Sequence, residues 1–376
     1  MKKKINLIFF HPYSLIGGAD TSLMRLIKNL DQRKYDIVFL SIKKSILKDK
    51  IKNIKFINLD CSRTLFSFFK FRNIVKRSLS SNNFEKIILI SNQNFANIFA
   101  FISTLGLNNL KRIFVERNHP DELFFLKSPK YLIKNLIIYF LIKITYPFAN
   151  KVITNSKLLT KSLKNITPKS KIATIYNPSF DKKIYELAKK KIQFKFKKNN
   201  KYIINVSRFT KRKGLEDLVI SFYKCQKIIK NLKLILIGYG EREENIKNLI
   251  SNLKLKKKVY LIKNCSNPHP YIKRSNLFVF NSKYEGFPNV LVESIMLNTP
   301  VISTNCNSGP SEILLNNKGG DLIKVNNNID IIKYKIINYF NNISMLHKKN
   351  NFAKKNLTRF TVKKNVKNYE NLFSKI

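Results

Sequence analysis

Short apolar runs alternate with segments of helical spacing along most of the chain, and this alternation limits the folds available to it. In the first half, the apolar runs have the length of buried strands. The predicted strands are 5–10, 36–42, 86–90, 112–115 and 151–154, and the predicted helices between them are 21–30, 65–79, 94–104 and 131–148. Strands that alternate with helices indicate βαβ units and a parallel sheet.

The alternation pauses near Asn177 and Pro178, and a lysine-rich stretch follows. Nine lysines lie between Lys182 and Lys201, which is typical of an exposed connector between domains. Beyond it the pattern resumes, with predicted strands 202–206, 232–237, 259–262, 277–281 and 301–304 and predicted helices 215–229, 241–253 and 290–297.

We therefore expect an α/β protein with two Rossmann-like domains facing across a cleft. The predicted domains are 1–180 and 181–359, and a basic amphipathic helix within 360–376 is expected to pack back on the first domain. Parallel sheets bind ligands beyond the carboxyl ends of their strands. The residues that follow each strand are therefore the candidates for chemistry.

The charge balance is extreme, because 72 Lys and Arg against 22 Asp and Glu give a formal net charge of +50. Such a surface attracts polyanions, including nucleic acid, anionic lipid and diphosphate substrates. Two explanations stay open: a compositional bias toward lysine, asparagine and isoleucine, and a charge that faces a membrane. No nucleic-acid-binding motif accompanies the charge, which disfavours a specific nucleic-acid partner.

The cysteines and histidines are scattered. The four cysteines form no CxxC pair, which argues against a zinc ribbon and suits a reducing, cytoplasmic compartment. The four histidines show no metal-ligand spacing. We therefore expect no bound metal and no cofactor.

Two apolar segments bear on membranes. The run from Ile5 to Phe10 is too short for a secretory signal. The longer stretch 131–148 contains Lys134, Asn135 and Lys143 and falls short of a clean span of about 20 apolar residues. An amphipathic or core helix fits it better, and we expect a peripheral protein on the inner face of the cytoplasmic membrane.

Gly17-Gly18 follows the first predicted strand and precedes a helix expected near Ala19. Glycines let a backbone approach a phosphate closely, and helix N-termini carry partial positive charge. Taken alone, however, a Gly-Gly pair in a loop is more often an ordinary turn than a binding site. Arg208 and Lys213 follow the first strand of the second half, where two cations can clamp a diphosphate; the alternative is a solvated basic loop.

Glu285 and Glu293 are separated by seven residues, in a loop shaped by Gly286 and Pro288. A helix is expected to begin at Asn289, whose side chain would cap it. Both carboxylates would then face the cleft, where they accept hydrogen bonds from sugar hydroxyls, while the backbone amides of 287–290 suit phosphate oxygens. Spacing alone is also compatible with two solvent-facing glutamates.

Five motifs occur in the order typical of family-4 retaining glycosyltransferases of the GT-B fold, which the chain resembles over nearly its whole length. They are Gly17-Gly18, Arg208-x4-Lys213-Gly214, Asn267-Pro268, Ser282-x-Tyr284-Glu285-Gly286-Phe287-Pro288-Asn289-Val290 with Glu293, and Ser308-Gly309-Pro310-Ser311-Glu312.

The resemblance implies a catalytic and donor-binding role for Glu285, Arg208 and Lys213. Glu285 would bind the donor sugar and Glu293 the ribose, and the two cations would hold the diphosphate. Gly17, Gly18 and the amides near Gly286, Phe287, Pro288, Asn289 and Val290 would assist them. The base pocket would be lined by Asn264, Cys265, Asn267 and Pro268.

Glu116-Arg117-Asn118-His119 resembles bacterial members of this family that build glycans on lipid carriers. The resemblance places these four residues on the acceptor side. A catalytic part for His119 is one interpretation, and a structural histidine beside Pro120 is the other.

The resemblance implies a retaining, metal-independent hexosyltransferase that takes a hexose or N-acetylhexosamine from a nucleotide sugar, with UDP favoured. The acceptor would be a glycan, expected to be lipid-linked, in synthesis of bacterial surface polysaccharide, lipopolysaccharide or glycoprotein. Two alternatives remain: a nucleotide-sugar epimerase or other GT-B enzyme, and a non-enzymatic basic protein that binds membrane or nucleic acid.

Overall fold

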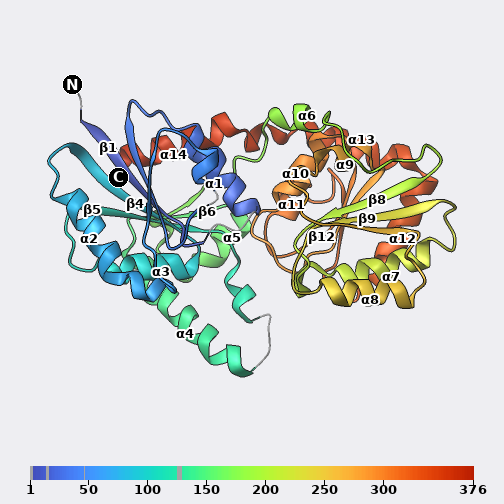
Figure 1. Ribbon diagram of the computed structural model, residues 1–376, viewed down its shortest axis with the longest axis horizontal. Helices are drawn as coiled ribbons and strands as arrows, with labels where there is room; N and C mark the ends of the chain where they lie inside the picture. Colours follow the sequence, from blue (N-terminus) through green and yellow to red (C-terminus); the bar gives the residue numbers. More distant parts are fainter. Residues whose placement is uncertain (1–2, 14–16, 46, 125–128) are drawn as a thin grey trace. The chain divides into compact units, whose positions relative to one another are not determined.

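The computed structural model describes residues 3–13, 17–45, 47–124 and 129–376, which form two compact units. Unit 1 comprises Met1–Pro178 and Val362–Ile376, and unit 2 comprises Ser179–Thr361 (Figure 1). The chain leaves unit 1 after Pro178, two residues before the sequence-based boundary at 180, and re-enters it at Val362.

Unit 1 contains a parallel sheet of seven strands in the order β3-β2-β1-β4-β5-β6-β7. Its strands are β1 (Lys4–Phe10), β2 (Tyr35–Ser41), β3 (Lys55–Asn58), β4 (Phe84–Asn92), β5 (Leu110–Glu116), β6 (Lys151–Thr154) and β7 (Ile172–Thr174). The order changes direction between β1 and β4, which marks the topological switch point of this sheet.

Helices cover both faces of this sheet because its central strands are apolar on both sides. Leu7 and Phe9 pack in one buried cluster, whereas Ile8 and Phe10 pack in another on the opposite face. The helices of unit 1 are α1 (Gly18–Lys28), α2 (Phe68–Leu79), α3 (Asn94–Ser103), α4 (Pro129–Thr145), α5 (Lys157–Leu163) and α14 (Val362–Lys375).

Unit 2 repeats the design with six parallel strands in the order β10-β9-β8-β11-β12-β13. The strands are β8 (Lys201–Val206), β9 (Leu232–Ile237), β10 (Val259–Ile262), β11 (Leu277–Phe280), β12 (Val301–Thr304) and β13 (Asp321–Ile323). The helices are α6 (Lys183–Leu187), α7 (Leu215–Cys225), α8 (Glu243–Asn252), α9 (His269–Arg274), α10 (Asn289–Met296), α11 (Pro310–Ile313), α12 (Ile329–Asn341) and α13 (Ile343–Lys355). The predicted α/β class with two parallel sheets is confirmed.

Three strands were not predicted: β3, β7 and β13. Each lies at a sheet edge and has only three or four residues. Edge strands pair on one side only and are partly exposed, so their sequences lack the continuous apolar run that identifies the central strands.

The prediction that 182–201 is a connector is wrong. Ser179 onward belongs to unit 2, and Ile184 in α6 is buried. Phe194 and Phe196 contact each other with ring centroids 4.9 Å apart, and Phe194 also contacts Tyr260 at 5.0 Å. Although its composition is dominated by lysine, the stretch 182–201 packs against unit 2 through these aromatic side chains.

The stretch 131–148 is also not a core helix. It is long and apolar enough to cross a membrane by length and composition, and only 17% of it is buried. The aliphatic part of a lysine side chain can lie along an apolar surface while its ammonium group stays in water. Lys134 and Lys143 are therefore compatible with an apolar helix of this length.

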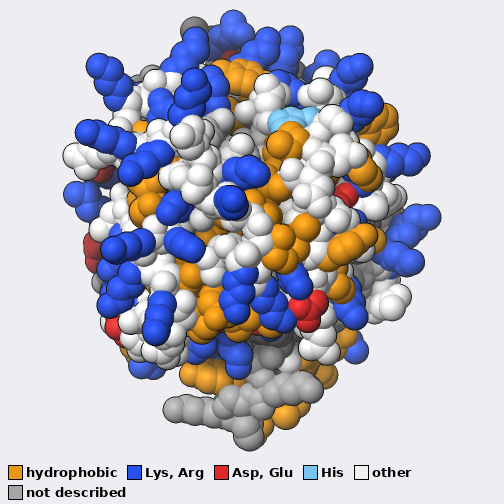
Figure 2. Space-filling model, turned by 90° about the vertical axis from the view of Figure 1, so that its right-hand side faces the viewer, with side chains coloured by type: hydrophobic (Ala, Val, Ile, Leu, Met, Phe, Trp, Pro, Cys, Tyr) orange, Lys and Arg blue, Asp and Glu red, His pale blue; other side chains and the backbone are white. Residues whose placement is uncertain are grey.

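The basic charge is spread widely over the surface. On the face shown in Figure 2, lysine and arginine side chains occur over the whole area and acidic ones are few. The net charge of +50 is therefore not confined to one patch of that face.

The last helix completes the core of unit 1. Val366, Tyr369 and Phe373 of α14 are buried in the same cluster as Leu7 and Phe9. The ring of Phe373 meets that of Tyr35 edge to face, with centroids 5.9 Å apart.

We predict that Phe373→Ala lowers the free energy of unfolding of unit 1 by about 3–5 kcal/mol, because it leaves a cavity in this cluster. Chemical unfolding followed by circular dichroism measures the loss. Lys375→Ala, an exposed change in the same helix, is the control. Equal stability of the two variants would contradict the assignment of α14 to the core.

Candidate functional site

Two loops meet at the switch point of unit 2, where β8 and β11 are neighbours in the sheet. The loop after β8 carries Gly214, and the loop after β11 carries Asn281. Asn281 Nδ2 donates to the carbonyl oxygen of Gly214 at 2.8 Å, and the amide of Lys283 donates to the carbonyl oxygen of Arg212 at 2.7 Å. Gly214 has φ +57°, and a Cβ there would lie 2.6 Å from the carbonyl oxygen of Asn281. Glycine is therefore required for this close approach.

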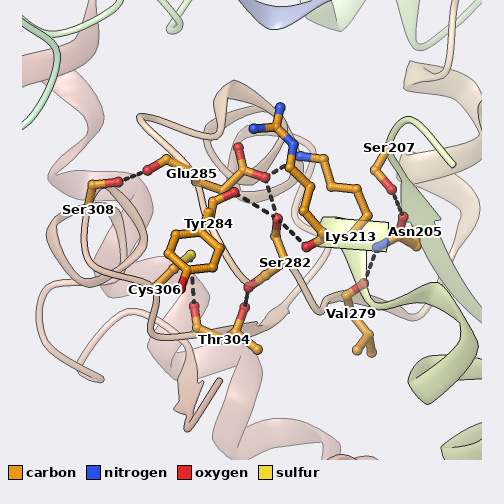
Figure 3. A network of polar contacts seen from close by, with 11 residues as sticks. Asn205, Ser207, Lys213, Val279, Ser282, Tyr284, Glu285, Thr304, Cys306 and Ser308 are labelled. Carbon is orange, nitrogen blue, oxygen red and sulfur yellow. Dashed lines mark hydrogen bonds and ion pairs between the residues drawn. The ribbon is translucent and has the colours of Figure 1, made fainter. Parts of the chain in front are cut away.

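A buried ion pair joins the same two loops. Lys213 Nζ contacts Glu285 Oε1, and the two side chains are only 10% and 12% exposed. Ser282 Oγ donates to the same carboxylate oxygen at 2.5 Å. Ser308 Oγ donates to the main-chain oxygen of Glu285, and Thr304 Oγ1 donates to that of Ser282 (Figure 3). These contacts hold Glu285 at the carboxyl end of the sheet.

The surroundings keep Glu285 ionised. Burial would raise its pKa, but the charges of Lys213 and Arg212 and the hydrogen bonds from Lys213 and Ser282 hold the pKa below its ordinary value. The described contacts of the carboxylate all go to Oε1, so Oε2 is available to accept a hydrogen bond from a ligand. The pKa of the nearby Cys306 thiol is raised to about 12 by burial and by Glu285, and this cysteine is therefore a neutral neighbour.

Arg208 lies in the loop that also carries Lys213, but its environment differs. Its side chain is exposed and has no hydrogen bond or ion pair with the rest of the chain that the structure describes. The ammonium group of Lys213 thus contacts Glu285 inside the protein, whereas the guanidinium of Arg208 is accessible from solvent.

Glu293 has a different set of neighbours. Its side chain is 12% exposed, and Oε2 lies 3.5 Å from Nε2 of His269. The other ring nitrogen of His269 lies 2.7 Å from Oδ1 of Asn267, and Asn267 Nδ2 donates to the carbonyl oxygen of Leu187 at 2.8 Å. The structure therefore brings Glu293 together with the predicted base-pocket loop, through a histidine to which sequence reasoning gave no role.

The other residues of that loop have varied environments. Asn264 is exposed and adopts the left-handed conformation with φ +48°. Cys265 and Pro268 are half-buried, and burial raises the pKa of the Cys265 thiol. His269 begins α9 directly after Asn267-Pro268, and this position was the signal available in the sequence.

The prediction that Asn289 caps a helix is wrong. The cap position of α10 is Pro288, without a side-chain cap, and Asn289 is the first helical residue. Asn289 Oδ1 accepts a hydrogen bond from Ser179 Oγ at 2.7 Å. Phe287 is buried against Phe360, with ring centroids 5.0 Å apart. The side chains of Phe287 and Asn289 thus stabilise unit 2.

The glycine pair lies at the corresponding position of unit 1, after β1. Gly17 is the N-cap of α1, and Gly18 is its first residue; the loop residues 14–16 lie outside the described residues. His11 Nε2 lies 3.1 Å from Asp20 Oδ1, and both side chains are buried. This pair ties the end of β1 to the first turn of α1 and was not predicted, because neither residue belongs to the recognised motifs.

The predicted acceptor residues follow β5 in unit 1. Glu116 Oε1 accepts hydrogen bonds from the amides of Arg117 and Asn118, and Oε2 accepts one from the hydroxyl of Tyr146. Burial raises the pKa of Glu116 to about 6. The guanidinium of Arg117 is buried as well, and it donates to Asn92 and Asn177.

Glu116 and Arg117 therefore brace the loop from inside unit 1. Asn118 and His119 are half-buried, and they are the two members of the predicted acceptor set with partly exposed side chains. Among the described residues, no group of three or more His, Cys, Asp or Glu side chains could hold a metal ion.

Comparison with known proteins decides the family. Residues 188–356 match the family described as "Glycosyl transferases group 1". The chain is 31% identical over 317 residues to an uncharacterized glycosyltransferase of Methanocaldococcus jannaschii, a match that covers 80% of this chain and 76% of the relative. The chain belongs to the group 1 glycosyltransferases. The predicted family resemblance is thereby confirmed.

Two further comparisons describe the relatives of this glycosyltransferase. The N-acetylgalactosamine-N,N'-diacetylbacillosaminyl-diphospho-undecaprenol 4-alpha-N-acetylgalactosaminyltransferase of Campylobacter jejuni is 30% identical over 237 residues, 62% of each chain. HepE of Anabaena, solved in complex with UDP-glucose, superposes with a TM-score of 0.78 at 16% identity and covers 99% of this chain and 100% of that one. The latter likeness concerns the fold, and it confirms the GT-B fold.

We predict that Lys213→Met lowers the free energy of unfolding of unit 2 by about 3–5 kcal/mol at neutral pH, because it leaves the Glu285 carboxylate buried without its cation. In the wild type the lowered pKa of Glu285 stabilises the fold at neutral pH, and this stabilisation is lost as the pH falls below about 4.5. In the variant we expect the pKa of Glu285 to be raised, so that stability falls as the pH rises from acid to neutral.

Unfolding curves across this pH range measure the effect. Lys211→Met, an exposed lysine of the same loop, controls for general loss of charge. Adding Glu285→Gln to Lys213→Met should recover most of the stability at neutral pH. A double variant that is additively worse would show that the two side chains do not act as a pair.

Proposed function

We propose that this glycosyltransferase is a retaining hexosyl- or N-acetylhexosaminyltransferase that uses a UDP-sugar and a lipid-linked glycan acceptor. Its product would belong to a bacterial surface polysaccharide, a lipopolysaccharide or a glycoprotein glycan. The observation that carries the proposal is the ionised, buried Glu285, which is paired with Lys213 at the switch point of unit 2 and lies one loop away from the exposed Arg208.

Each part of this site suits one part of a nucleotide sugar. Oε2 of Glu285 accepts a hydrogen bond from a sugar hydroxyl. Lys213 retains donor hydrogens beyond the one used on Glu285, and together with Arg208 it neutralises the diphosphate. Glu293, oriented by His269, accepts from the ribose hydroxyls.

The proposed reaction proceeds by attack on the face from which the diphosphate departs. The bond from the acceptor oxygen to the anomeric carbon forms as the bond to the phosphate oxygen breaks. The acceptor proton passes to a phosphate oxygen of the departing nucleotide diphosphate. Lys213 and Arg208 stabilise the charge that develops on this leaving group, so the protein supplies orientation and electrostatics without a metal ion.

The relatives support the choice of substrates. The HepE structure contains UDP-glucose, and the name of the Campylobacter enzyme specifies an undecaprenol-linked diphosphate glycan. We assign the acceptor to the side of unit 1 that carries Asn118 and His119. Four free cysteines fit a cytoplasmic site of action, where disulfides rarely form.

We predict that Glu285→Gln reduces transfer by roughly a hundredfold or more, since the ionised carboxylate and its charge pair are lost while the shape is kept. Glutamine is preferable to alanine because alanine would leave Lys213 in a cavity without a partner. The assay supplies UDP-hexoses and UDP-N-acetylhexosamines with a lipid-linked glycan acceptor in the presence of EDTA, and proton NMR determines the anomeric configuration of the product.

Asp217→Asn, which changes a half-buried carboxylate of α7 outside the pair, is the matched control and should retain turnover. Wild-type turnover in Glu285→Gln, an inverted product, or loss of activity with EDTA would each overturn a separate part of the proposal. An isomerised nucleotide sugar formed without acceptor would favour an epimerase.

We predict that Arg208→Ala weakens UDP binding about tenfold without changing stability, because the side chain is exposed and has no partner in the described part of the chain. Isothermal titration calorimetry measures the affinity. Lys211→Ala, an exposed cation three residues away, should change it little. Equal effects of the two variants would show a general influence of charge and would remove Arg208 from the site.

A further inference from the structure

Helix α4 presents a stripe of apolar side chains to solvent. The α4 stripe consists of residues spaced three or four apart, as on one face of a helix: Ile133 (69% exposed), Leu136 (50%), Ile137 (54%), Phe140 (62%) and Ile144 (43%). Phe148, just beyond the helix, is 65% exposed and stacks on Phe101 of α3. Isolated exposed apolar residues are ordinary, but a contiguous stripe of this kind marks an interaction surface.

The opposite side of α4 is anchored in unit 1. Ile142 and the following Tyr146 are fully buried in a cluster with Phe114 and Val152. Tyr146 also donates to Glu116 and accepts from Asn97. The helix is thus attached to unit 1 through its C-terminal half, whereas Tyr131 and Leu132 near its start are 47% and 44% exposed. The stripe lies on the side that faces away from these buried contacts.

This anchoring excludes a transmembrane arrangement. The 17 residues of α4 extend about 25 Å, close to the thickness of a hydrocarbon core. However, the helix connects β5 to β6, which are hydrogen-bonded neighbours in one parallel sheet. The C-terminal end of α4 is held in the core of unit 1 by Ile142 and Tyr146, and the rest of the helix is too short to span a bilayer. The helix can therefore lie along a membrane surface but cannot cross it while the fold persists.

The charged residues near the α4 stripe indicate which kind of partner surface it would contact. From residue 123 to residue 180 the chain contains ten lysines and no aspartate or glutamate. Three of these lysines lie on α4 itself, and two of the three, Lys134 and Lys143, are exposed. Lys143 Nζ lies 4.9 Å from the ring centroid of Tyr139. Helix α4 itself carries lysines and no acidic residue, although Glu122 lies in the segment Pro120–Phe124 that packs against it. An apolar stripe beside lysines matches the headgroup region of an anionic bilayer.

We propose that the α4 stripe docks this glycosyltransferase on an anionic lipid surface, with Ile133, Ile137 and Phe140 inserted among the acyl chains. The flanking lysines bind the lipid phosphates. The net charge of +50 attracts the protein to an anionic membrane, and on the face seen in Figure 2 lysine and arginine are spread widely rather than gathered in one patch. The stripe provides the orientation, since its apolar side chains insert at a fixed place on the surface of unit 1.

A reporter for this insertion is easily placed, because the chain contains no tryptophan. Ile137→Trp puts a single indole in the stripe, and Ile228→Trp puts one at a site of unit 2 that is 59% exposed. Each variant is mixed with vesicles of phosphatidylcholine and phosphatidylglycerol in equal parts at physiological ionic strength. We expect a blue-shifted emission and quenching by brominated acyl chains for Ile137→Trp, and neither effect for Ile228→Trp.

A second comparison measures binding itself. Ile133→Ser, Ile137→Ser and Phe140→Ser in one chain should weaken vesicle binding roughly tenfold or more in co-sedimentation. The matched control changes three exposed apolar residues of unit 2, Ile228, Tyr334 and Phe352, to serine and should bind as the wild type does. UDP binding and circular dichroism should be unchanged in both variants, since none of these side chains is in the donor site or the core.

Three results would overturn the proposal: a wild-type protein that stays in the supernatant with anionic vesicles, equal vesicle binding by the two triple variants, or an Ile137→Trp emission that vesicles leave unchanged. If the stripe instead covers a second copy of the chain, analytical ultracentrifugation without lipid would show a dimer that the α4 variant loses. Vesicle binding requires neither donor nor acceptor, so its failure would leave the proposed glycosyl transfer untouched.

Discussion

Both sheets are covered by helices on two faces, and this burial determines where polar chemistry can be located. A strand such as β1 alternates Leu7 and Phe9 on one face with Ile8 and Phe10 on the other, and all four are buried. Charged groups cannot be placed along such a strand without a large desolvation cost. They are collected instead at the carboxyl ends, and most sharply where the strand order reverses.

The Lys213–Glu285 pair shows how unit 2 uses that position. The pair is nearly out of contact with water, so each charge depends on the other and on the hydroxyl of Ser282. Gly214 makes this possible, because the two loops approach too closely for any side chain at that residue. The absence of a side chain at Gly214 lets the two loops approach, and this approach places Lys213 beside Glu285 and lowers the pKa of that carboxyl group. The arrangement is present without a bound ligand.

The central strands, the family motifs and the order of the candidate site residues could be predicted from the sequence, because each depends on local pattern. The edge strands β3 and β7 could not, because their partly exposed residues lack a continuous apolar run. The contact of His269 with Glu293 was also missed. The sequence shows His269 directly after the Asn267-Pro268 motif, but it does not show which groups tertiary packing brings together. The stretch 182–201 was misread for the opposite reason: its lysines dominate the composition, while Phe194 and Phe196 decide the packing.

The return of α14 to unit 1 has a consequence for synthesis on the ribosome. Unit 2 is inserted into unit 1, and its two ends lie side by side, since the amides of Ser179 and Phe180 both donate to the carbonyl oxygen of Phe360. All residues of unit 2 emerge before Val366, Tyr369 and Phe373, which the first core needs. The core of the domain whose translation starts first is therefore completed only after all of unit 2 has been synthesised, when α14 packs against it.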